Sequence, residues 1–233
     1  MKKFLVITSI TNGKDKLIDP KETYSNCDYI AYVDKKQDDC KVWEQKDIYN
    51  FSSIDGYKNR RNAKPYKILS SVMFPEYEYV IWEDGNHQLK KNPQEIIDEY
   101  GDNNDILVFK HPDRKCTYQE MKACAQWNLD DIVNIQNQFN HYKNNNMPEL
   151  FGLYEMSTFI MKTSHSVKEL QLMWWEQITK FSSRDQISFP YCLWKMGDKI
   201  IKKKLRGYSN LFSMDGKNTG NDYFDDQGKH LKY

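Results

Sequence analysis

Short apolar runs recur along the chain, and each is bounded by polar and turn-forming residues. They cover residues 3–10, 28–33, 79–82, 105–110 and 153–162, with a weaker run at 41–49. Runs of this length with such boundaries are typical of strands buried in a sheet. We therefore predict a strand in each of these segments.

Apolar residues at helical spacing occupy most of the segments between these runs. The spacing predicts helices around 68–73, 93–100, 117–127, 129–145, 166–181 and 184–197. Thr117 and Glu120 have the spacing of a capping box, in which a threonine side chain caps the start of a helix. Strands that alternate with helices predict an α/β fold, here one domain with a mixed, mostly parallel central sheet flanked by helices. Ligands of such sheets bind beyond the carboxyl ends of the strands, so the residues that follow each run are the first site candidates.

The charge balance narrows the classes of partner. Lys and Arg total 34 and Asp and Glu total 33, which gives a formal net charge of +1. A chain with so little net charge has no overall field to hold nucleic acid or an anionic membrane, so any phosphate must be held by a local cluster. Aromatic residues make up 14% of the chain. Disordered chains are poor in such residues, so we expect a folded domain.

The N-terminus and the cysteines indicate a cytoplasmic location. The first apolar run is shorter than that of a signal peptide and ends at Asn12-Gly13 with no cleavage site. No run approaches the roughly 18 apolar residues of a membrane span, although peripheral membrane association stays open. The five cysteines are odd in number and form no C-x-x-C pair. We therefore expect reduced thiols and no zinc site.

A carboxylate-bearing turn follows the run at 79–82. Its residues are Trp82, Glu83, Asp84, Gly85 and Asn86. Residues i and i+2 of an extended chain face the same side, so Asp84 and Asn86 can share one divalent cation. Their oxygen ligands suit Mg²⁺ or Mn²⁺. The alternative is an Asp-Gly β-turn that binds nothing.

Three basic residues precede that turn at intervals of three: Arg61, Lys64 and Lys67. On a helix or its entry turn they can present one cationic face to a diphosphate. The alternative is a basic face that is simply solvated. His111 and Arg114 follow the run at 105–110, and they suit a phosphate or a sugar hydroxyl unless the histidine is a loop residue without a role.

A last group of polar residues opens the final predicted helix. Arg184, Asp185 and Gln186 stand there, and Glu155 lies near the start of the run at 153–162. Together these side chains offer hydrogen-bond partners to sugar hydroxyls. An aspartate at a helix start is also a common cap, so both interpretations stay open.

Several common enzyme classes lose their usual support. The sequence contains no P-loop, no G-x-G-x-x-G, no G-x-S-x-G and no H-E-x-x-H motif. Kinase, dehydrogenase, α/β-hydrolase and zincin assignments depend on such motifs.

The order of four sequence blocks resembles one known family. The blocks are IWEDGNHQL, FKHPDRKCTYQEMKAC, LYEMSTFIMK and WWEQITKFSSRDQISFPY, and the matching region extends from about Arg60 to Met196. In this order they resemble a glycosyltransferase-like domain family that includes plant proteins of seed mucilage and pollen. The R-D-Q-x-S-F block at 184–189 is the most specific of them.

The resemblance implies a GT-A fold over residues 1–206, with 207–233 as a C-terminal extension that packs on or closes the site. It implies a nucleotide-sugar donor, with UDP as the expected nucleotide, and a saccharide or glycoconjugate acceptor. It also implies Mn²⁺ or Mg²⁺ at Asp84 and Asn86, in the place of a D-x-D motif. Asn86 replaces the second acid of that motif, which weakens the cation site by one charge.

The resemblance also implies roles for individual residues. The expected donor-binding residues are Thr8, Asp34, Arg61, Lys64, Lys67, Glu83, His111, Arg114, Arg184 and Gln186. Thr8 and Asp34 are included by position alone, at the expected ends of the first two strands. Asp185 and Glu155 are the catalytic candidates, either as the base of an inverting enzyme or, for Asp185 in a retaining enzyme, as a ligand of donor hydroxyls. Trp82 and Tyr154 are candidates either to stack on sugar or to pack in the core.

Two other functions stay open. A nucleotidyl- or phosphotransferase would use the same carboxylate and basic cluster but would release pyrophosphate or transfer phosphate. A non-catalytic sugar- or nucleotide-binding module on a degenerate GT-A fold is consistent with Asn86. The expected activity is hexosyl or pentosyl transfer in polysaccharide synthesis, and the sequence does not identify the donor sugar, the acceptor or the stereochemical outcome.

Overall fold

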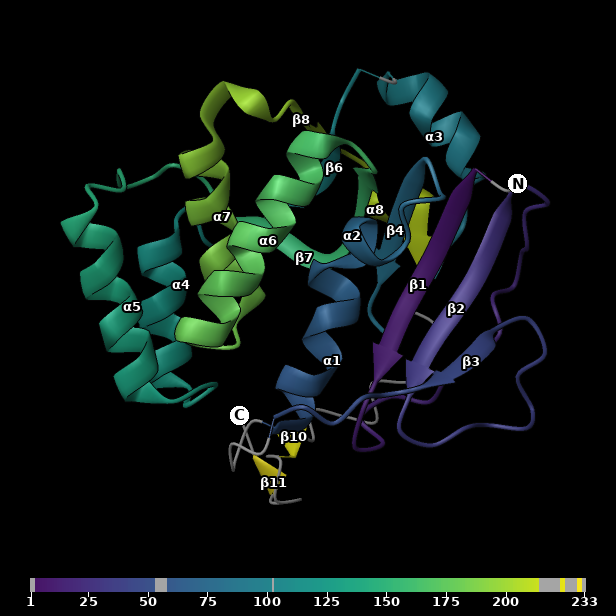
Figure 1. Cartoon of the computed structure of the whole chain (residues 1–233), viewed down its shortest axis with the longest axis horizontal. Coiled ribbons are helices and arrows are strands. Elements are labelled where there is room, and N and C mark those ends of the chain that lie inside the picture. The colour runs from purple at the N-terminus through teal and green to yellow at the C-terminus, as the bar shows by residue number, and fades with distance from the viewer. Residues whose placement is uncertain (1–2, 53–57, 102, 214–222, 225–229, 232–233) are drawn as a thin grey trace.

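A seven-stranded sheet forms the centre of the chain, and helices cover it (Figure 1). The computed structural model describes residues 3–52, 58–101, 103–213, 223–224 and 230–231. The order of the strands across the sheet is β3-β2-β1-β4-β7-β6-β8. Their bounds are β1 Phe4–Ile10, β2 Cys27–Val33, β3 Glu44–Asp47, β4 Tyr79–Glu83, β6 Ile106–Lys110, β7 Tyr154–Lys162 and β8 Lys202–Leu205.

The sheet is mixed and mostly parallel, as the alternation of strands and helices predicts. Only β7 among these seven strands runs antiparallel to its neighbours β4 and β6. All the predicted strands are present, although β3 is shorter than the segment 41–49. The edge strand β8 was not predicted, because its sequence KKKL lacks an apolar run. Charged residues on an edge strand discourage pairing with other chains, so such a strand need not be apolar.

The helices follow the predicted order with different bounds. They are α1 Lys58–Ile68, α2 Ser70–Met73, α3 Pro93–Tyr100, α4 Thr117–Gln126, α5 Ile132–Asn144, α6 His165–Lys180, α7 Asp185–Met196, the 3₁₀ turn η1 Gly197–Lys199, and α8 Tyr208–Leu211. The helix predicted around 68–73 is the end of a longer helical segment, because α1 begins at Lys58 and includes the basic residues and Pro65. This extension places Lys64 and Lys67 on a helix.

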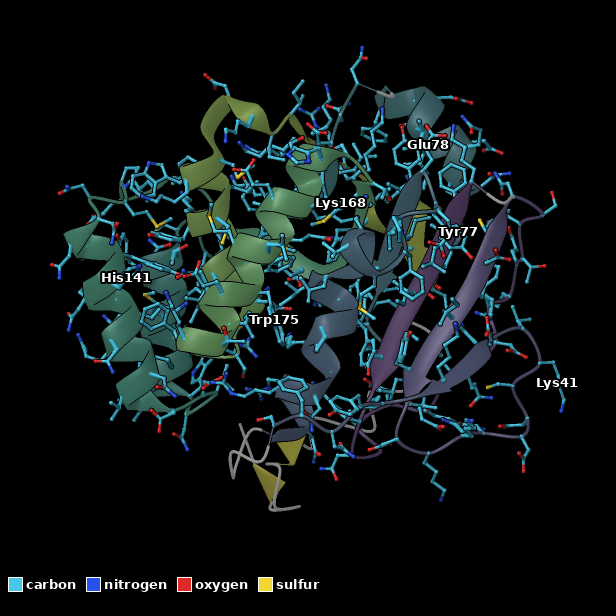
Figure 2. All side chains as sticks on the ribbon, viewed as in Figure 1. Lys41, Tyr77, Glu78, His141, Lys168 and Trp175 are labelled. Carbon is cyan, nitrogen blue, oxygen red and sulfur yellow. The ribbon has the colours of Figure 1, made fainter. Side chains whose placement is uncertain are left out.

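Two apolar layers cover the two faces of the sheet. Leu5 and Ile7 of β1 face the layer that contains side chains of α4 to α7, and Val6 faces the layer closed by α3. Alternate residues of a strand point to opposite faces, so one strand serves both layers. Figure 2 shows His141 on α5 among the side chains of the helical layer, and its ring lies 5.7 Å from the ring of Tyr191 on α7.

The capping box predicted at the start of α4 is wrong. Thr117 is the first helical residue, and the N-cap is Cys116, whose side chain makes no capping hydrogen bond. The Thr117 hydroxyl instead donates to the carbonyl of Ile187 at 3.4 Å. The helix starts one residue too early for the box, which leaves the Glu120 carboxylate available for other partners.

Residues 207–213 pack on the domain. β9 (Phe212–Ser213) pairs antiparallel with β5 (Gln88–Leu89), and Phe212 is fully buried. Further on, β10 (Tyr223–Phe224) pairs antiparallel with β11 (His230–Leu231). Within the described residues, no helix combines the length and the apolar character needed to cross a bilayer.

Candidate functional site

The polar residues that follow the strands lie together at one edge of the sheet, the edge formed by the carboxyl ends of β4 and β6. β4 ends at Glu83, and the backbone N–H of Asp84 donates to the carbonyl of Ser157 on β7 at 2.8 Å. β6 ends at Lys110, and the N–H of His111 donates to the carbonyl of Leu153 at 3.0 Å. Because β7 is antiparallel, its first residues lie at the carboxyl ends of its neighbours. The sheet topology therefore brings Asp84, His111 and Glu155 to the same edge.

Helices α1 and α7 add a chain of alternating charges to this edge. The Lys64 and Lys67 ammonium groups each lie 2.7 Å from Oδ2 of Asp185. Lys67 also lies 3.2 Å from Oδ1 of Asp84. The side chains of Lys67 and Asp185 are only 5% and 9% exposed, whereas that of Asp84 is 42% exposed. The buried end of the cluster is therefore fixed by ion pairs, and its outer end faces the solvent.

The local electrostatics keep both aspartates ionised. Burial opposes ionisation of Asp185, but the Lys64 and Lys67 ammonium groups prevail and hold its pKa well below its usual range. Burial likewise opposes ionisation of Asp84, and Lys67 is the main cause of its lowered pKa. Burial lowers the pKa of Lys64 to about 8, although Asp185 acts against this shift. Asp185 and Asp84 outweigh burial at Lys67 and raise its pKa.

The core supports the exposed carboxylate. The indole N–H of Trp82 donates to Oδ1 of Asp84 at 2.8 Å, and the Lys67 ammonium lies 5.2 Å from the centre of the indole ring. Trp82 and Tyr154 are 3% and 2% exposed. Both rings therefore pack in the core, and neither presents a face on which a sugar can stack.

Arg61 does not join the cluster. Its guanidinium is buried and donates to the carbonyls of Ile178 and Phe181 at 2.6 and 2.7 Å, at the end of α6. Each residue of an α-helix turns by about 100°, so Arg61 lies about 120° around α1 from Lys67. The expected single cationic face thus consists of Lys64 and Lys67, while Arg61 binds the neighbouring helix.

Glu83 also points away from Asp84. Its carboxylate is buried and accepts a hydrogen bond from the backbone N–H of Leu89 at 3.0 Å. Burial raises the pKa of Glu83 to about 8, and no cationic partner acts against this shift among the residues that influence it. The side chain serves the turn between β4 and β5 on the other face of the sheet.

The residues after Asp84 form a tight turn. Asn86 Oδ1 lies 2.6 Å from Nδ1 of His87. A Cβ atom on Gly85 would lie 2.7 Å from Cδ1 of Ile10 and 3.1 Å from Cβ of Asp15. Only glycine therefore allows the turn after β1 to pack against this one. His87 was not predicted from the sequence, although it shares the post-strand position of its neighbours.

A second polar group lies beside the first. The Gln186 amide donates to both carboxylate oxygens of Glu155 at 3.3 and 3.4 Å. Arg184 lies 3.7 Å from Glu120, a buried carboxylate that Arg114 also contacts at 2.5 Å. The Glu155 carboxylate thus binds a neutral amide, in contrast to Asp185, which binds two cations.

His111 anchors the loop that carries Arg114. Its Nδ1 accepts hydrogen bonds from the backbone N–H groups of Asp113 and Arg114 at 3.1 and 3.0 Å. Burial lowers the pKa of His111, and the Arg114 guanidinium lowers it further. The ring is therefore neutral near pH 7 and shapes the loop.

A cavity of about 250 Å³ lies where β1 and β2 end, and Ile10, Val33, Asp34 and Gln37 contribute to its lining. Asp34 accepts a hydrogen bond from the backbone N–H of Asn12. The prediction that Asp34 follows β2 is confirmed. Thr8 lies inside β1 and is buried, because the strand extends to Ile10.

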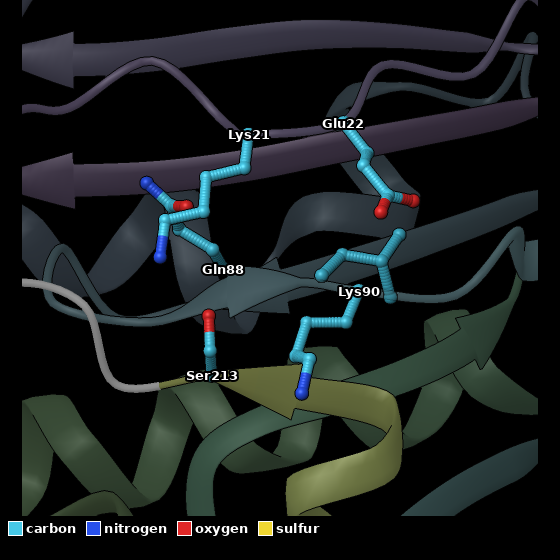
Figure 3. A pocket seen from close by; sticks show the side chains of 6 residues that line it. Lys21, Glu22, Gln88, Lys90 and Ser213 are labelled. Carbon is cyan, nitrogen blue, oxygen red and sulfur yellow. The ribbon is translucent and has the colours of Figure 1, made fainter.

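Lys14 is a further cation that the sequence did not single out. Desolvation and the Arg60 guanidinium lower its pKa, and Asp84 acts in the opposite direction. Its ammonium therefore lies within electrostatic reach of the site. Lys14 belongs to a polar, mostly exposed segment, and only its position after the first strand pointed to it. A separate cavity of about 180 Å³ is lined by residues of β5 and β9 together with Lys21, Glu22 and Lys90 (Figure 3).

The described donors do not form a resident site for a divalent cation. Among the residues that the structure describes, no group of three or more His, Cys, Asp and Glu side chains is placed to hold a metal ion. Oδ1 of Asp84 already accepts from Trp82 and contacts Lys67, and Asn86 contacts His87. Asp84 and Asn86 alone do not match the expected Mn²⁺ or Mg²⁺ set.

Fold and site together define an α/β domain with a cluster of charged side chains at the carboxyl ends of its central strands. The chain belongs to the TOD1/MUCI70 family of glycosyltransferase-like domains, whose model matches residues 1–215. The resemblance seen in the four sequence blocks is thereby confirmed.

One relative and two solved structures are similar to this chain. The Arabidopsis thaliana protein named probable hexosyltransferase MUCI70 is 27% identical over 172 residues, which cover 70% of this chain and 28% of the relative. The chain thus spans less than a third of that protein. The apo structure of the WbbM bifunctional glycosyltransferase matches with 10% identity and a TM-score of 0.47, over 88% of this chain and 39% of the other. Apo mouse xyloside xylosyltransferase 1 matches with 10% identity and a TM-score of 0.43, over 89% and 91%.

Proposed function

We propose that this chain transfers a sugar, with a hexose as the first candidate, from a nucleotide-sugar donor to a saccharide or glycoconjugate acceptor on a GT-A type fold. The family supports the reaction class. The observation that carries the proposal is the pair of ammonium groups of Lys64, which is partly buried, and Lys67, which is buried. They meet Asp185 and Asp84 at the edge of the sheet where ligands of α/β folds bind.

The nucleotide part of the donor fits the cavity at the ends of β1 and β2. Apolar side chains of Ile10 and Val33 line it beside the carboxylate of Asp34. An apolar wall suits a base, and a carboxylate accepts hydrogen bonds from a base or a ribose. In this proposal the diphosphate extends from the cavity past Lys14 toward Lys64 and Lys67. UDP is our first candidate for the nucleotide.

In the reaction the bond between the anomeric carbon and the terminal phosphate oxygen breaks, and the electron pair stays on that oxygen. Lys64 and Lys67 stabilise the resulting negative charge. The acceptor oxygen bonds to the anomeric carbon and gives up its proton. In an inverting reaction Glu155 takes that proton, because its carboxylate accepts hydrogen bonds from a neutral amide and a backbone N–H. Asp185, ionised and held by two lysines, orients these lysines instead.

The test is a screen of UDP-, GDP- and CDP-sugars, with release of each product measured by chromatography. We expect release of nucleoside diphosphate and free sugar when water replaces the acceptor. Glu155→Gln is expected to lower the transfer rate about 100-fold or more in an inverting reaction. The exposed Glu99→Gln is the matched control.

Product identity separates the alternatives. Release of pyrophosphate or transfer of phosphate would instead identify a nucleotidyl- or phosphotransferase. Binding of sugar nucleotides without any turnover, even with candidate acceptors, would identify a binding module.

A further inference from the structure

A side-chain cation, the Lys67 ammonium, already lies beside Asp84, where the family resemblance implies a divalent metal ion. The Lys67 ammonium lies 3.2 Å from Asp84 and 2.7 Å from Asp185, so it bridges two carboxylates. A bridging cation between paired carboxylates is the usual part of a Mg²⁺ or Mn²⁺ ion that binds phosphate. Here the Lys67 ammonium group on α1 has that role.

The other charges at this edge also favour an anion over a second cation. Lys64 contacts the same Asp185 oxygen that Lys67 contacts, and Lys14 lies within electrostatic reach of Asp84. Asp15 lies beside Lys14, and burial raises the pKa of its carboxyl. Lys64 and Lys67 thus place two ammonium groups in direct contact with the carboxylates of this edge, and Lys14 lies nearby. A divalent cation at Asp84 would be repelled by the ammonium groups, whereas a diphosphate would be attracted.

The geometry also shows how the site changes when an anion arrives. The Asp84 side chain is 42% exposed and is thus able to turn into water, whereas the Lys67 side chain is 5% exposed and stays in place. Lysine acts as a compact point charge toward phosphate and has three donors to share. Phosphate oxygens can therefore take the place of the Asp84 contact at Lys67 and bind the remaining donors of Lys64.

We propose that the diphosphate of the donor binds directly to Lys64 and Lys67, and that these ammonium groups supply the charge neutralisation for which related folds use a divalent cation. This inference rests on the proposed function. It concerns how the same site holds its ligand, and it predicts binding that does not need a metal ion.

Calorimetric titration of the whole chain with UDP, GDP and CDP tests this directly. Each titration is made in EDTA, in Mg²⁺ and in Mn²⁺. The dissociation constant of the nucleotide that binds should differ by less than about threefold among these conditions. Lys67→Met should weaken binding about tenfold or more in every condition, because a charge-assisted contact is lost. Lys91→Met, which also removes a half-buried lysine from an ion pair, is the control and should bind like wild type.

Asp84→Asn gives the sharpest contrast and does not depend on the stability of the Lys67 variant. Asp84 is the outermost carboxylate, so its substitution should be tolerated by the fold. Removing a negative charge beside the diphosphate should leave the affinity unchanged or increase it by a few fold. A metal-bridged site would instead lose affinity about tenfold or more in Mg²⁺ or Mn²⁺.

The outcomes separate this inference from the proposed function. Binding that requires Mg²⁺ or Mn²⁺, or that Asp84→Asn abolishes, would overturn the inference and leave the proposed function standing. Absence of binding by UDP, GDP and CDP under every condition would overturn both. Binding in EDTA that Lys67→Met weakens and Asp84→Asn preserves would establish the inference.

Discussion

Single residues of the site differ mainly in how their charge is held. Asp185 and Lys67 are buried together, so each fixes the ionisation of the other. Lys64 is different, because burial outweighs its aspartate partner and its pKa falls to about 8. Of the two lysines that contact Asp185, Lys64 is therefore the one that loses its proton closer to physiological pH.

The pH dependence of diphosphate binding should show this titration. Below pH 8 Lys64 is charged, and nucleoside diphosphate binding is at full strength. As the pH rises past 8 the free chain loses this charge, so the affinity should fall by up to about tenfold per pH unit. Lys64→Met should bind more weakly at pH 7 and lose the slope above pH 8. Calorimetry between pH 7 and pH 9.5 measures both, and an unchanged slope in Lys64→Met would assign the titration to another group.

At the scale of elements, the apolar pattern predicted every central strand, but it missed the edge strand β8 and the full length of α1. Polar and basic residues dominate both, and their helical or strand state depends on packing against the sheet. The site residues were recognised as separate groups on the chain. Their assembly was not predictable, because Lys64 and Asp185 meet only when α1 and α7 pack on the same edge.

The interpretation of Arg61 failed for a reason specific to helices. Helical residues spaced by three are neighbours on the helix surface. The first and third members of such a series, Arg61 and Lys67, lie about 120° apart and so face different sides. The sequence gives no sign that the end of α6 lies beside α1, so the two carbonyls that bind Arg61 were not foreseeable. Trp82 and Tyr154 are buried because of how the elements pack together, and the amino-acid sequence alone does not show that packing.

Arg61 should therefore contribute to stability. Arg61→Met leaves the carbonyls of Ile178 and Phe181 without their donor, and each unsatisfied buried group costs about 1–3 kcal/mol. We expect a loss of about 2–4 kcal/mol in the free energy of unfolding, measured by urea denaturation. The affinity of the folded variant for nucleoside diphosphate should stay within about twofold of wild type. The exposed Arg206→Met is the control, and a large loss of affinity without loss of stability would instead place Arg61 in the ligand site.

At the scale of the whole molecule, the chain is almost neutral, yet it gathers charged side chains of both signs at one site. The net charge of +1 conceals a site in which ammonium groups from α1 and the turn after β1 meet carboxylates from α7 and the turn after β4. These elements lie far apart in the sequence and are joined only through the central sheet. A ligand held by this site therefore binds only when the sheet and the helices that cover it are in place.

Ligand binding should consequently stabilise the domain as one unit. A nucleoside diphosphate at a concentration 100 times its dissociation constant adds about 2.7 kcal/mol to the free energy of unfolding. For a chain of this size, 1 kcal/mol raises the Tm by about 2–4 °C, so the expected rise is about 5–10 °C. Differential scanning calorimetry should show one transition that moves as a whole, with a much smaller shift in Lys67→Met at the same ligand concentration. Two transitions, of which only one moves, would show that part of the sheet unfolds independently of the site.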